Sequence, residues 1–415
     1  MRKILSQPVL AVALSLTFSQ GLWAADLFKL DVTVHPGTPA EQTGSTGFAN
    51  VKDLFNQLDG PGLQQVSNSY SDTAATNARI DYRGLPMSID MAAGGTAVTL
   101  KIPGVIPDQV FDKGSTRDAN LNAVDDFFKR NGDSLMSAIQ KKLAATSPVD
   151  PIAGNPNSLQ STMVASGFDQ AFTAFASNVK AAPTTTAQAA DSSGLVALGL
   201  RFGSYSQNGL RSESVTLPLS YTYRGFGEGR QLSLNLPITV GQVGSAKVLQ
   251  GGLGVAYRHP MNENWALTPA ASLGAAGSID MGSAAAMTSY SVTSQYTIAL
   301  DGYDLSIGNM IGRYETLKIQ TKDYSYDPGI SNTIYRNGVM LSQPVVLEGK
   351  PLALEFSAVN TVFTGSELYN KWTNEFGVTI GTRKGSDQPS YLRAGISLLQ
   401  GAKSHGLSLN FGYWF

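Results

Sequence analysis

The chain has 415 residues, more than one compact core usually holds, and its 30 Lys and Arg nearly cancel 31 Asp and Glu to leave a net charge of −1. This balance excludes the broad basic surface that nucleic-acid binding requires. Cysteine is absent and only three histidines occur, so we expect no disulfide, no metal site and no cofactor. A hydrophobic fraction of 42% without long apolar runs excludes a bundle of membrane-spanning helices.

Residues 1–24 predict a secretory signal peptide. Arg2 and Lys3 precede a short apolar stretch, and the segment closes with the small residue Ala24. A membrane anchor is the alternative, but Ser6, Gln7 and Pro8 interrupt the beginning of the segment. We therefore expect cleavage after Ala24 and export of the mature chain.

Residues 25–157 predict a small exported α+β domain. An apolar repeat at helical spacing runs from Phe48 to Leu58 and stops at the turn residues that follow Asp59. Later in the segment, Asp133 has the character of a helix cap. The remaining elements that we expect are strands at 79–82, 86–91 and 96–102 and helices at 120–129 and after 133.

Asp118, Asn120 and Asn122 alternate in the way that begins a calcium-binding loop. The sixth position of such a loop is glycine and the twelfth is glutamate, but here they are Ala123 and Lys129. The pattern therefore favours a polar helix start over a metal site.

Residues 147–156 and 158–193 predict a joint and a linker. Three prolines within 147–156 forbid a helix or a central strand, so this segment is a structural joint or, alternatively, a binding loop. Apolar residues at 158–182 indicate a slender helix, and the Ala- and Thr-rich run at 181–190 indicates a flexible tether. The helix either lies in the lumen of the following domain, as a plug or threaded linker, or simply ends the preceding domain.

Residues 194–415 predict a transmembrane antiparallel β-barrel of about twelve strands. Short segments with strict alternation recur between polar turns. A soluble sandwich produces the same alternation, but aromatic residues near strand ends and polar opposite faces favour a barrel in lipid. Pro218, Pro237, Pro269 and Pro344 indicate bulges or misplaced boundaries. The candidate strands are 195–205, 212–224, 230–241, 247–258, 263–275, 286–300, 302–317, 333–347, 350–363, 369–383, 389–400 and 404–415.

The connections between these strands form two groups. Short links at 224–230, 259–263, 300–302, 347–350 and 384–388 are expected on one side of the membrane, and longer ones at 275–286, 318–332 and 363–369 on the other. Charged residues on the polar faces are candidates to line the pore and set its electrostatics. These candidates are Arg258, Glu355, Glu375, Arg383 and Arg393.

The last segment places alternate apolar residues on one face: Leu407, Leu409, Phe411, Tyr413 and Phe415. It resembles the aromatic-ended strand that the insertion machinery of bacterial outer membranes recognises. The twelve-strand count with an N-terminal domain and linker is similar to autotransporter translocators and to amyloid-exporter barrels. This resemblance implies a protein of the Gram-negative cell outer membrane, with membrane lipid and that machinery as partners and a possible homo-oligomer.

Two functions follow from these expectations. In the first, the barrel is a translocator or surface anchor for residues 25–157. In the alternative, it is a channel or exporter whose N-terminal domain and helix form a periplasmic plug or docking module. A linker that displays the domain outside must cross about 30 Å, for which roughly 20 helical residues suffice. Because no catalytic motif is present, we expect no enzyme.

Overall fold

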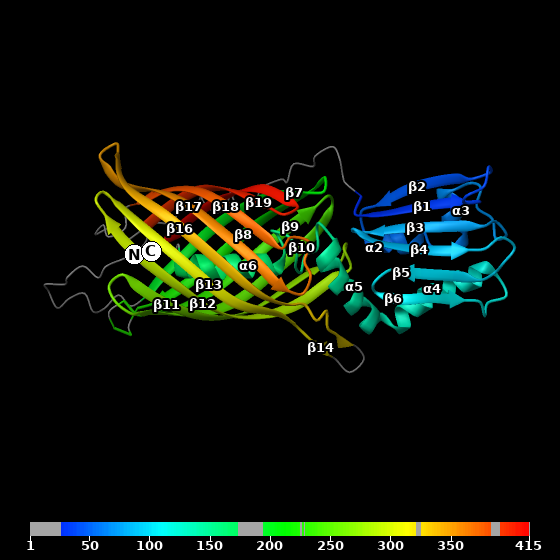
Figure 1. The fold of residues 1–415 in the computed structure, drawn as a ribbon, viewed down its shortest axis with the longest axis horizontal. Helices are drawn as coiled ribbons and strands as arrows, with labels where there is room; N and C mark the ends of the chain where they lie inside the picture. Colours follow the sequence, from blue (N-terminus) through cyan, green and yellow to red (C-terminus); the bar gives the residue numbers. More distant parts are fainter. Residues whose placement is uncertain are drawn as a thin grey trace, which may run out of the picture.

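The computed structural model describes residues 26–172, 194–224, 226–227, 229–320, 325–382 and 391–414. The predicted signal peptide, the tether at 181–190 and the site candidates Arg383 and Phe415 lie outside these residues. A small α+β domain sits on one end of a long β-barrel, and helix α6 lies inside the barrel (Figure 1). None of the helices in the described ranges has the length and apolar character needed to cross a membrane.

The N-terminal domain is a six-stranded antiparallel sheet with helices packed on it. Its strand order is β2-β1-β3-β4-β5-β6. Alternate residues of β1, β3 and β4 are buried, as a sheet covered on one face requires. The strands are β1 (Phe28–Val34), β2 (Gln42–Phe48), β3 (Thr76–Tyr82), β4 (Leu85–Met91), β5 (Val98–Ile102) and β6 (Ile106–Phe111), and the helices are α2 (Val51–Asn56), α3 (Gly60–Val66), α4 (Arg117–Arg130) and α5 (Gly132–Thr146).

The domain differs from the sequence expectation in two details of helix capping. The sequence predicted that a helix stops at Asp59, but α2 ends at Asn56 and Asp59 is the N-cap of a further helix, α3. The Asp59 side chain accepts a hydrogen bond from Gly62 N at 2.7 Å. Asp133 is not a cap, because it lies inside the first turn of α5 and instead accepts from Ser325 N at 2.5 Å. The expected strands are present, and β1, β2 and β6 are additional.

The predicted calcium-loop residues hold the start of α4. Asp118 accepts a hydrogen bond from Gly60 N at 3.2 Å, and the buried Asn120 donates to Thr96 O at 2.8 Å. Arg117, also buried, donates to four backbone carbonyls. Within the described residues, no group of three or more His, Cys, Asp or Glu could hold a metal ion.

Twelve long antiparallel strands close into a barrel, which confirms the predicted fold class. Pro218 and Pro237 lie opposite one another in neighbouring strands, and the ladders that flank this pair are interrupted, so the prolines occupy breaks in the pairing. The strands are β7 (Gly194–Gln207), β8 (Leu210–Tyr223), β9 (Gln231–Val243), β10 (Ala246–Pro260), β11 (Trp265–Ser278), β12 (Ser283–Leu300), β13 (Tyr303–Leu317), β16 (Ser331–Leu347), β17 (Lys350–Gly365), β18 (Trp372–Thr382), β19 (Tyr391–Gly401) and β20 (Ser404–Trp414).

The barrel has two distinct ends. The terminal end holds the first strand residue, Gly194, the last, Trp414, and tight turns such as Glu348-Gly349. The domain end faces the N-terminal domain and holds the connection 318–330, which includes the short strands β14 (Ile319–Gln320) and β15 (Ser325–Tyr326). The expected links that the structure describes therefore lie in two groups at opposite ends, and the link expected at 384–388 lies outside the described residues.

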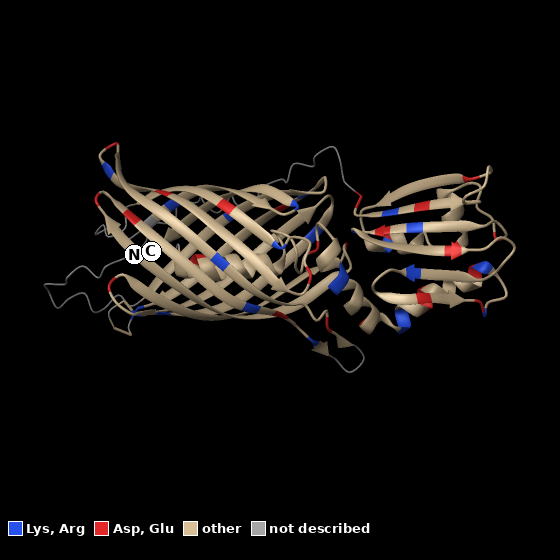
Figure 2. Ribbon diagram, in the orientation of Figure 1, with Lys and Arg blue, Asp and Glu red and all other residues tan. Residues whose placement is uncertain are grey.

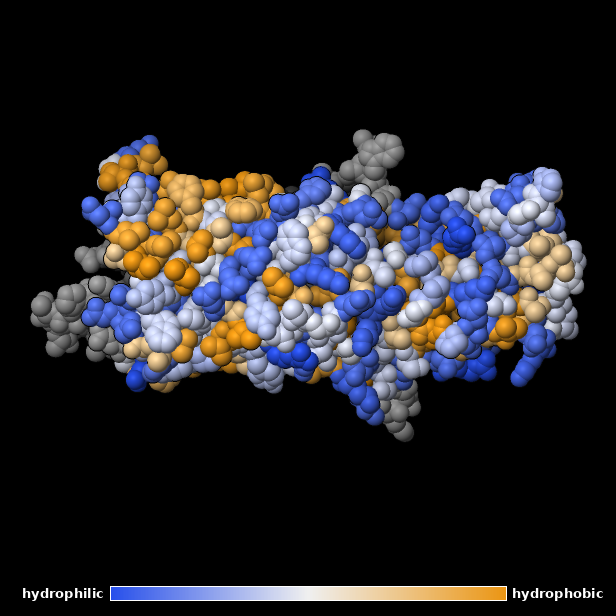
Figure 3. Space-filling view, viewed as in Figure 1, coloured by the Kyte–Doolittle hydropathy of each residue, from blue (hydrophilic) through white to orange (hydrophobic). Residues whose placement is uncertain are grey.

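The outer surface of the barrel is apolar over the half nearer the terminal end. Figure 3 shows hydrophobic residues gathered there and hydrophilic residues over the half nearer the domain. Lys, Arg, Asp and Glu are sparse along the strands (Figure 2). The apolar half includes outward side chains that are between 38% and 58% exposed, among them Leu253, Leu273, Ile311, Phe356, Phe376, Ile396, Leu409 and Phe411.

The half nearer the domain carries exposed polar pairs instead. Arg211 and Glu213 of β8 form an ion pair at 3.0 Å. Arg313 of β13 bonds Glu315 at 2.7 Å and also contacts Ser331 of the neighbouring strand. Such side chains favour water over hydrocarbon.

Candidate functional site in the barrel lumen

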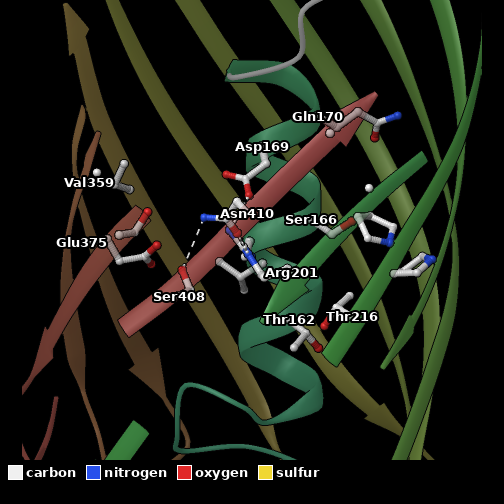
Figure 4. A pocket seen from close by; sticks show the side chains of 18 of the residues that line it. Thr162, Ser166, Asp169, Gln170, Arg201, Thr216, Val359, Glu375, Ser408 and Asn410 are labelled. Carbon is white, nitrogen blue, oxygen red and sulfur yellow. Dashed lines mark hydrogen bonds and ion pairs between the residues drawn. The ribbon is translucent and has the colours of Figure 1, made fainter. Parts of the chain in front are cut away.

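Helix α6 (Leu159–Phe172) runs inside the barrel along one wall (Figure 4). It packs against strands β10, β11, β12 and β13. Its apolar face is buried there, with Phe168 and Phe172 fully inaccessible to solvent and their rings 4.8 Å apart. The structure thus places the predicted linker helix in the lumen, through the part of 158–182 that is described.

Inward glycines on the barrel wall make room for the large side chains of α6. A Cβ atom added at Gly274 would lie 2.8 Å from Met163 Sδ, and one at Gly338 would lie 3.0 Å from Phe168 Cζ. A Cβ atom at Gly308 would overlap the ring of Phe172. Because real Cβ atoms almost never approach this closely, these glycines are a shape requirement for seating the helix.

The opposite wall, made of β7–β9 and β17–β20, is not filled by the helix. A cavity of about 360 Å³ separates it from α6. The side chains around this space are mostly hydroxyls, amides and charges, for example Ser166 and Gln170 from the helix and Thr216 and Ser408 from the strands (Figure 4). The lumen therefore has an apolar half occupied by the helix and a polar half that is open.

Two arginines connect the helix to the polar wall. Arg201 of β7 forms an ion pair with Asp169 of α6 at 3.1 Å and donates through Nε to Asn410 Oδ1 at 2.6 Å. Arg336 of β16 bonds Glu375 at 2.8 Å, and its guanidinium lies 5.2 Å from the centre of the Phe168 ring. The strand charges thus fix the side of the helix that faces the cavity.

The structure places four of the five predicted lumen charges beside this cavity: Arg258, Glu355, Glu375 and Arg393. Glu355 pairs with Arg393, and Arg258 donates to Gln295 Oε1 at 2.7 Å. Arg383 lies outside the described residues.

Sequence reasoning missed Asp169, Arg201 and Arg336. Period-2 alternation could have found the two arginines. Arg201 shares the inward face of its segment with Tyr205, and Arg336 points to the same side of its strand as the buried Ile334. The carboxylate of Asp169 could not be placed, because the sequence left the position of the helix open.

A buried polar network joins the domain to the barrel. Arg83, at the β3–β4 turn, donates to Ser283 of β12 at 2.8 Å, and Ser283 donates to Gln140 of α5 at 2.6 Å. Gln140 in turn donates to Asp150 at 2.7 Å, and Asp150 lies 3.7 Å from Arg83 Nη1. All four residues are at most 5% exposed. The predicted joint at 147–156 therefore belongs to a rigid connection.

The joint is also hydrogen-bonded to the barrel at the domain end. Asn370, beside β18, donates its backbone N–H to Gly154 O at 3.0 Å, and its side-chain amide donates to Gln207 Oε1 at 3.2 Å. Asn157 bonds both Ser212 and Ser214 of β8.

The residues of the predicted insertion strand alternate as expected. Leu409, Phe411 and Tyr413 point outward and are 38%, 47% and 42% exposed, and Leu407 shares their face. Phe415 lies outside the described residues.

No family model and no curated protein matches the chain. Solved structures resemble it over about half of its length. The β domain of the Bordetella autotransporter Brka has a TM-score of 0.44 and 13% identity over 54% of this chain and 99% of its own. The translocator domain of the autotransporter NalP from Neisseria meningitidis has a TM-score of 0.39 and 14% identity over 54% and 88%. The KdgM porin in complex with disordered oligogalacturonate has a TM-score of 0.33 and 10% identity over 53% and 98%.

Proposed function

We propose that this chain is an outer-membrane β-barrel protein that anchors its N-terminal domain, residues 26–157, on the outer surface of the cell. One observation carries the proposal: the domain caps the barrel end opposite Gly194 and Trp414, and α6 leads from the domain into the lumen (Figure 1). The role is that of an anchor without enzymatic activity.

The placement in a membrane is supported by the outer surface. Side chains such as Leu253 and Leu273 are more than half exposed. On the face seen in Figure 3, hydrophobic residues gather on the half of the barrel nearer the terminal end. Monomeric soluble proteins rarely expose apolar patches of this extent. A closed barrel leaves no strand edge unpaired, which is the condition for crossing hydrocarbon with strands.

The orientation is supported by the position of that apolar half. It lies toward the terminal end, so the polar half and the domain project together on the other side. A chain exported from inside the cell reaches the outer membrane from the periplasm. If the terminal end of the barrel stays on the periplasmic side, its turns do not have to cross the membrane. The domain end, with the long connection 318–330, then faces outward, in line with short periplasmic turns and longer external loops.

The alternative role, a channel with a periplasmic plug, is favoured by the cavity beside α6. The two roles place the domain on opposite sides of the membrane. They are therefore separated by a measurement of sidedness.

Single cysteines provide that measurement, because the natural chain has none. Ala40→Cys lies in the exposed β1–β2 loop of the domain, and Asp301→Cys lies in an exposed turn at the terminal end. On intact cells, a membrane-impermeant maleimide is expected to label Ala40→Cys at once and Asp301→Cys only after the outer membrane is permeabilised. The reverse pattern would overturn surface display and establish a periplasmic domain. Labelling of neither site before permeabilisation would also overturn it.

A further inference from the structure

The polar half of the lumen is built differently from a packed core. The apolar face of α6 packs on glycines such as Gly274, Gly308 and Gly338, whereas seven charged side chains line the cavity. Four of them lie on the opposite wall, and the others are Asp169 of the helix, Arg258 of β10 and Arg336 of β16. Charges are costly to bury without water or a partner. A space of about 360 Å³ is roomy enough for several water molecules.

The charges around the cavity do not cancel. Its lining contains four arginines, at 201, 258, 336 and 393, and three carboxylates, at 169, 355 and 375, so the sum is +1. Every carboxylate is in an ion pair with one arginine: 169 with 201, 375 with 336, and 355 with 393.

Arg258 accounts for the surplus. Its side chain donates to the neutral amide of Gln295, and within the described residues no carboxylate lies within ion-pair distance of it. It stands on β10 two residues from the terminal end of that strand, beside Gln231 in the pairing register. Near the terminal end, the cavity is thus lined by a guanidinium that no carboxylate among the described residues neutralises.

We propose that the half-lumen beside α6 is a water-filled compartment that admits small anions, with Arg258 as the residue that selects them. The low-dielectric walls of a cleft concentrate the field of one unpaired charge and raise the local concentration of counter-ions. On the side toward the domain, Asn157, which also lines the cavity, bonds Ser212 and Ser214. We expect small solutes to enter it from the terminal end, near which Arg258 lies.

The test uses the full-length purified protein in detergent, so it does not depend on which side of a membrane the domain occupies. Ser233→Cys lies on β9 close to Arg258 in register, and Ser397→Cys lies on the facing wall; both positions line the cavity. Their modification rates are measured with two small thiol reagents of similar size, an anionic sulfonate and a cationic ammonium methanethiosulfonate. Each rate is divided by the rate of the same reagent with free 2-mercaptoethanol.

We expect both cysteines to react without unfolding, and the anionic reagent to be favoured by about tenfold at Ser233→Cys after this normalisation. Arg258→Gln should abolish the preference there. Arg313→Gln, which removes an exterior guanidinium, should leave it unchanged.

Two results would overturn the inference. If neither cysteine reacts while the protein stays folded, the space is not a solvent compartment. If both react but the charge preference is absent, or survives Arg258→Gln, then this arginine does not select anions. A native circular dichroism spectrum is required of every variant, so that a loss of fold is recognised. The sidedness of Ala40→Cys tests the proposed surface display separately.

Discussion

Arg83 and Asp150 face each other across the joint between domain and barrel, with Nη1 and Oδ1 3.7 Å apart and both side chains fully inaccessible to solvent. Arg83 itself has a positive φ of 54°, so the turn that presents it is held in an uncommon conformation for a residue with a side chain. This pair and its two amide and hydroxyl partners connect segments that are up to 200 residues apart in the chain. It follows that the domain and the barrel are stabilised as one unit at this point.

The substitution Asp150→Asn should destabilise the joint. It leaves the guanidinium of Arg83 buried without a counter-charge, for which we expect a loss of about 3–5 kcal/mol. The measurement is the urea midpoint for proteolytic cleavage of the domain. Asp31→Asn is the matched control, because its pair with Lys29 is exposed and contributes at most about 1 kcal/mol. Equal midpoints for the two variants would contradict a structural role for the joint.

Gly308→Ala should unseat helix α6 while the barrel stays closed. The added methyl group overlaps the ring of Phe172, and overpacking of this kind costs about 1–3 kcal/mol. Hydrogen exchange of residues 159–172 should become about tenfold faster, since this corresponds to about 1.4 kcal/mol. Gly241→Ala, whose methyl group meets ordinary contacts at 3.5 Å or more, should leave that exchange unchanged. Unaltered exchange in Gly308→Ala would mean that the glycine is not required for seating.

Arg117→Lys should destabilise the N-terminal domain. The guanidinium donates to the carbonyls of Ser71, Ala74, Ala92 and Gly95 at 2.7 to 2.9 Å, and an ammonium cannot reach all four. We expect a loss of at least about 3 kcal/mol, because hydrogen bonds to charged groups contribute about 1.5–3 kcal/mol each.

The control for this prediction is Arg130→Lys at the exposed end of the same helix, which should change stability by less than about 0.5 kcal/mol. Chemical unfolding of the domain, followed by cleavage of its loops, reports both changes. If Arg117→Lys is as stable as the control variant, the four hydrogen bonds of Arg117 do not stabilise the domain.

Ile396→Arg should impair assembly into the membrane. Ile396 is 43% exposed and lies opposite Leu409 in the apolar half, where a charge facing hydrocarbon costs about 2–4 kcal/mol. His405→Arg, on the exposed polar half, should cost about 0–1 kcal/mol. The readout is the fraction of each variant that migrates as a folded, heat-modifiable barrel from envelope fractions. Similar fractions would indicate that the apolar half does not contact lipid.

Alternation in the sequence located the barrel strands well, because in a strand with one apolar and one polar face the apolar residues recur at every second position. Segments such as 404–415 and 230–241 lie within a few residues of β20 and β9. The strands of the N-terminal domain were harder to predict from the sequence. Strand β2, with the sequence QTGSTGF, has little hydrophobic pattern because it is an edge strand in which no residue is fully buried.

Local sequence therefore determined the class of each part of this protein: an α+β domain, a helix and a twelve-stranded barrel. Only the tertiary structure decided that the helix lies against the wall of β10–β13, that Arg201 faces Asp169, and that the domain caps the end opposite Gly194 and Trp414. The physical reason is range. Periodicity reports the burial of neighbours a few residues apart, whereas contacts such as Arg201–Asp169 and Arg83–Ser283 join residues 32 and 200 positions apart and depend on how the closed barrel brings them together.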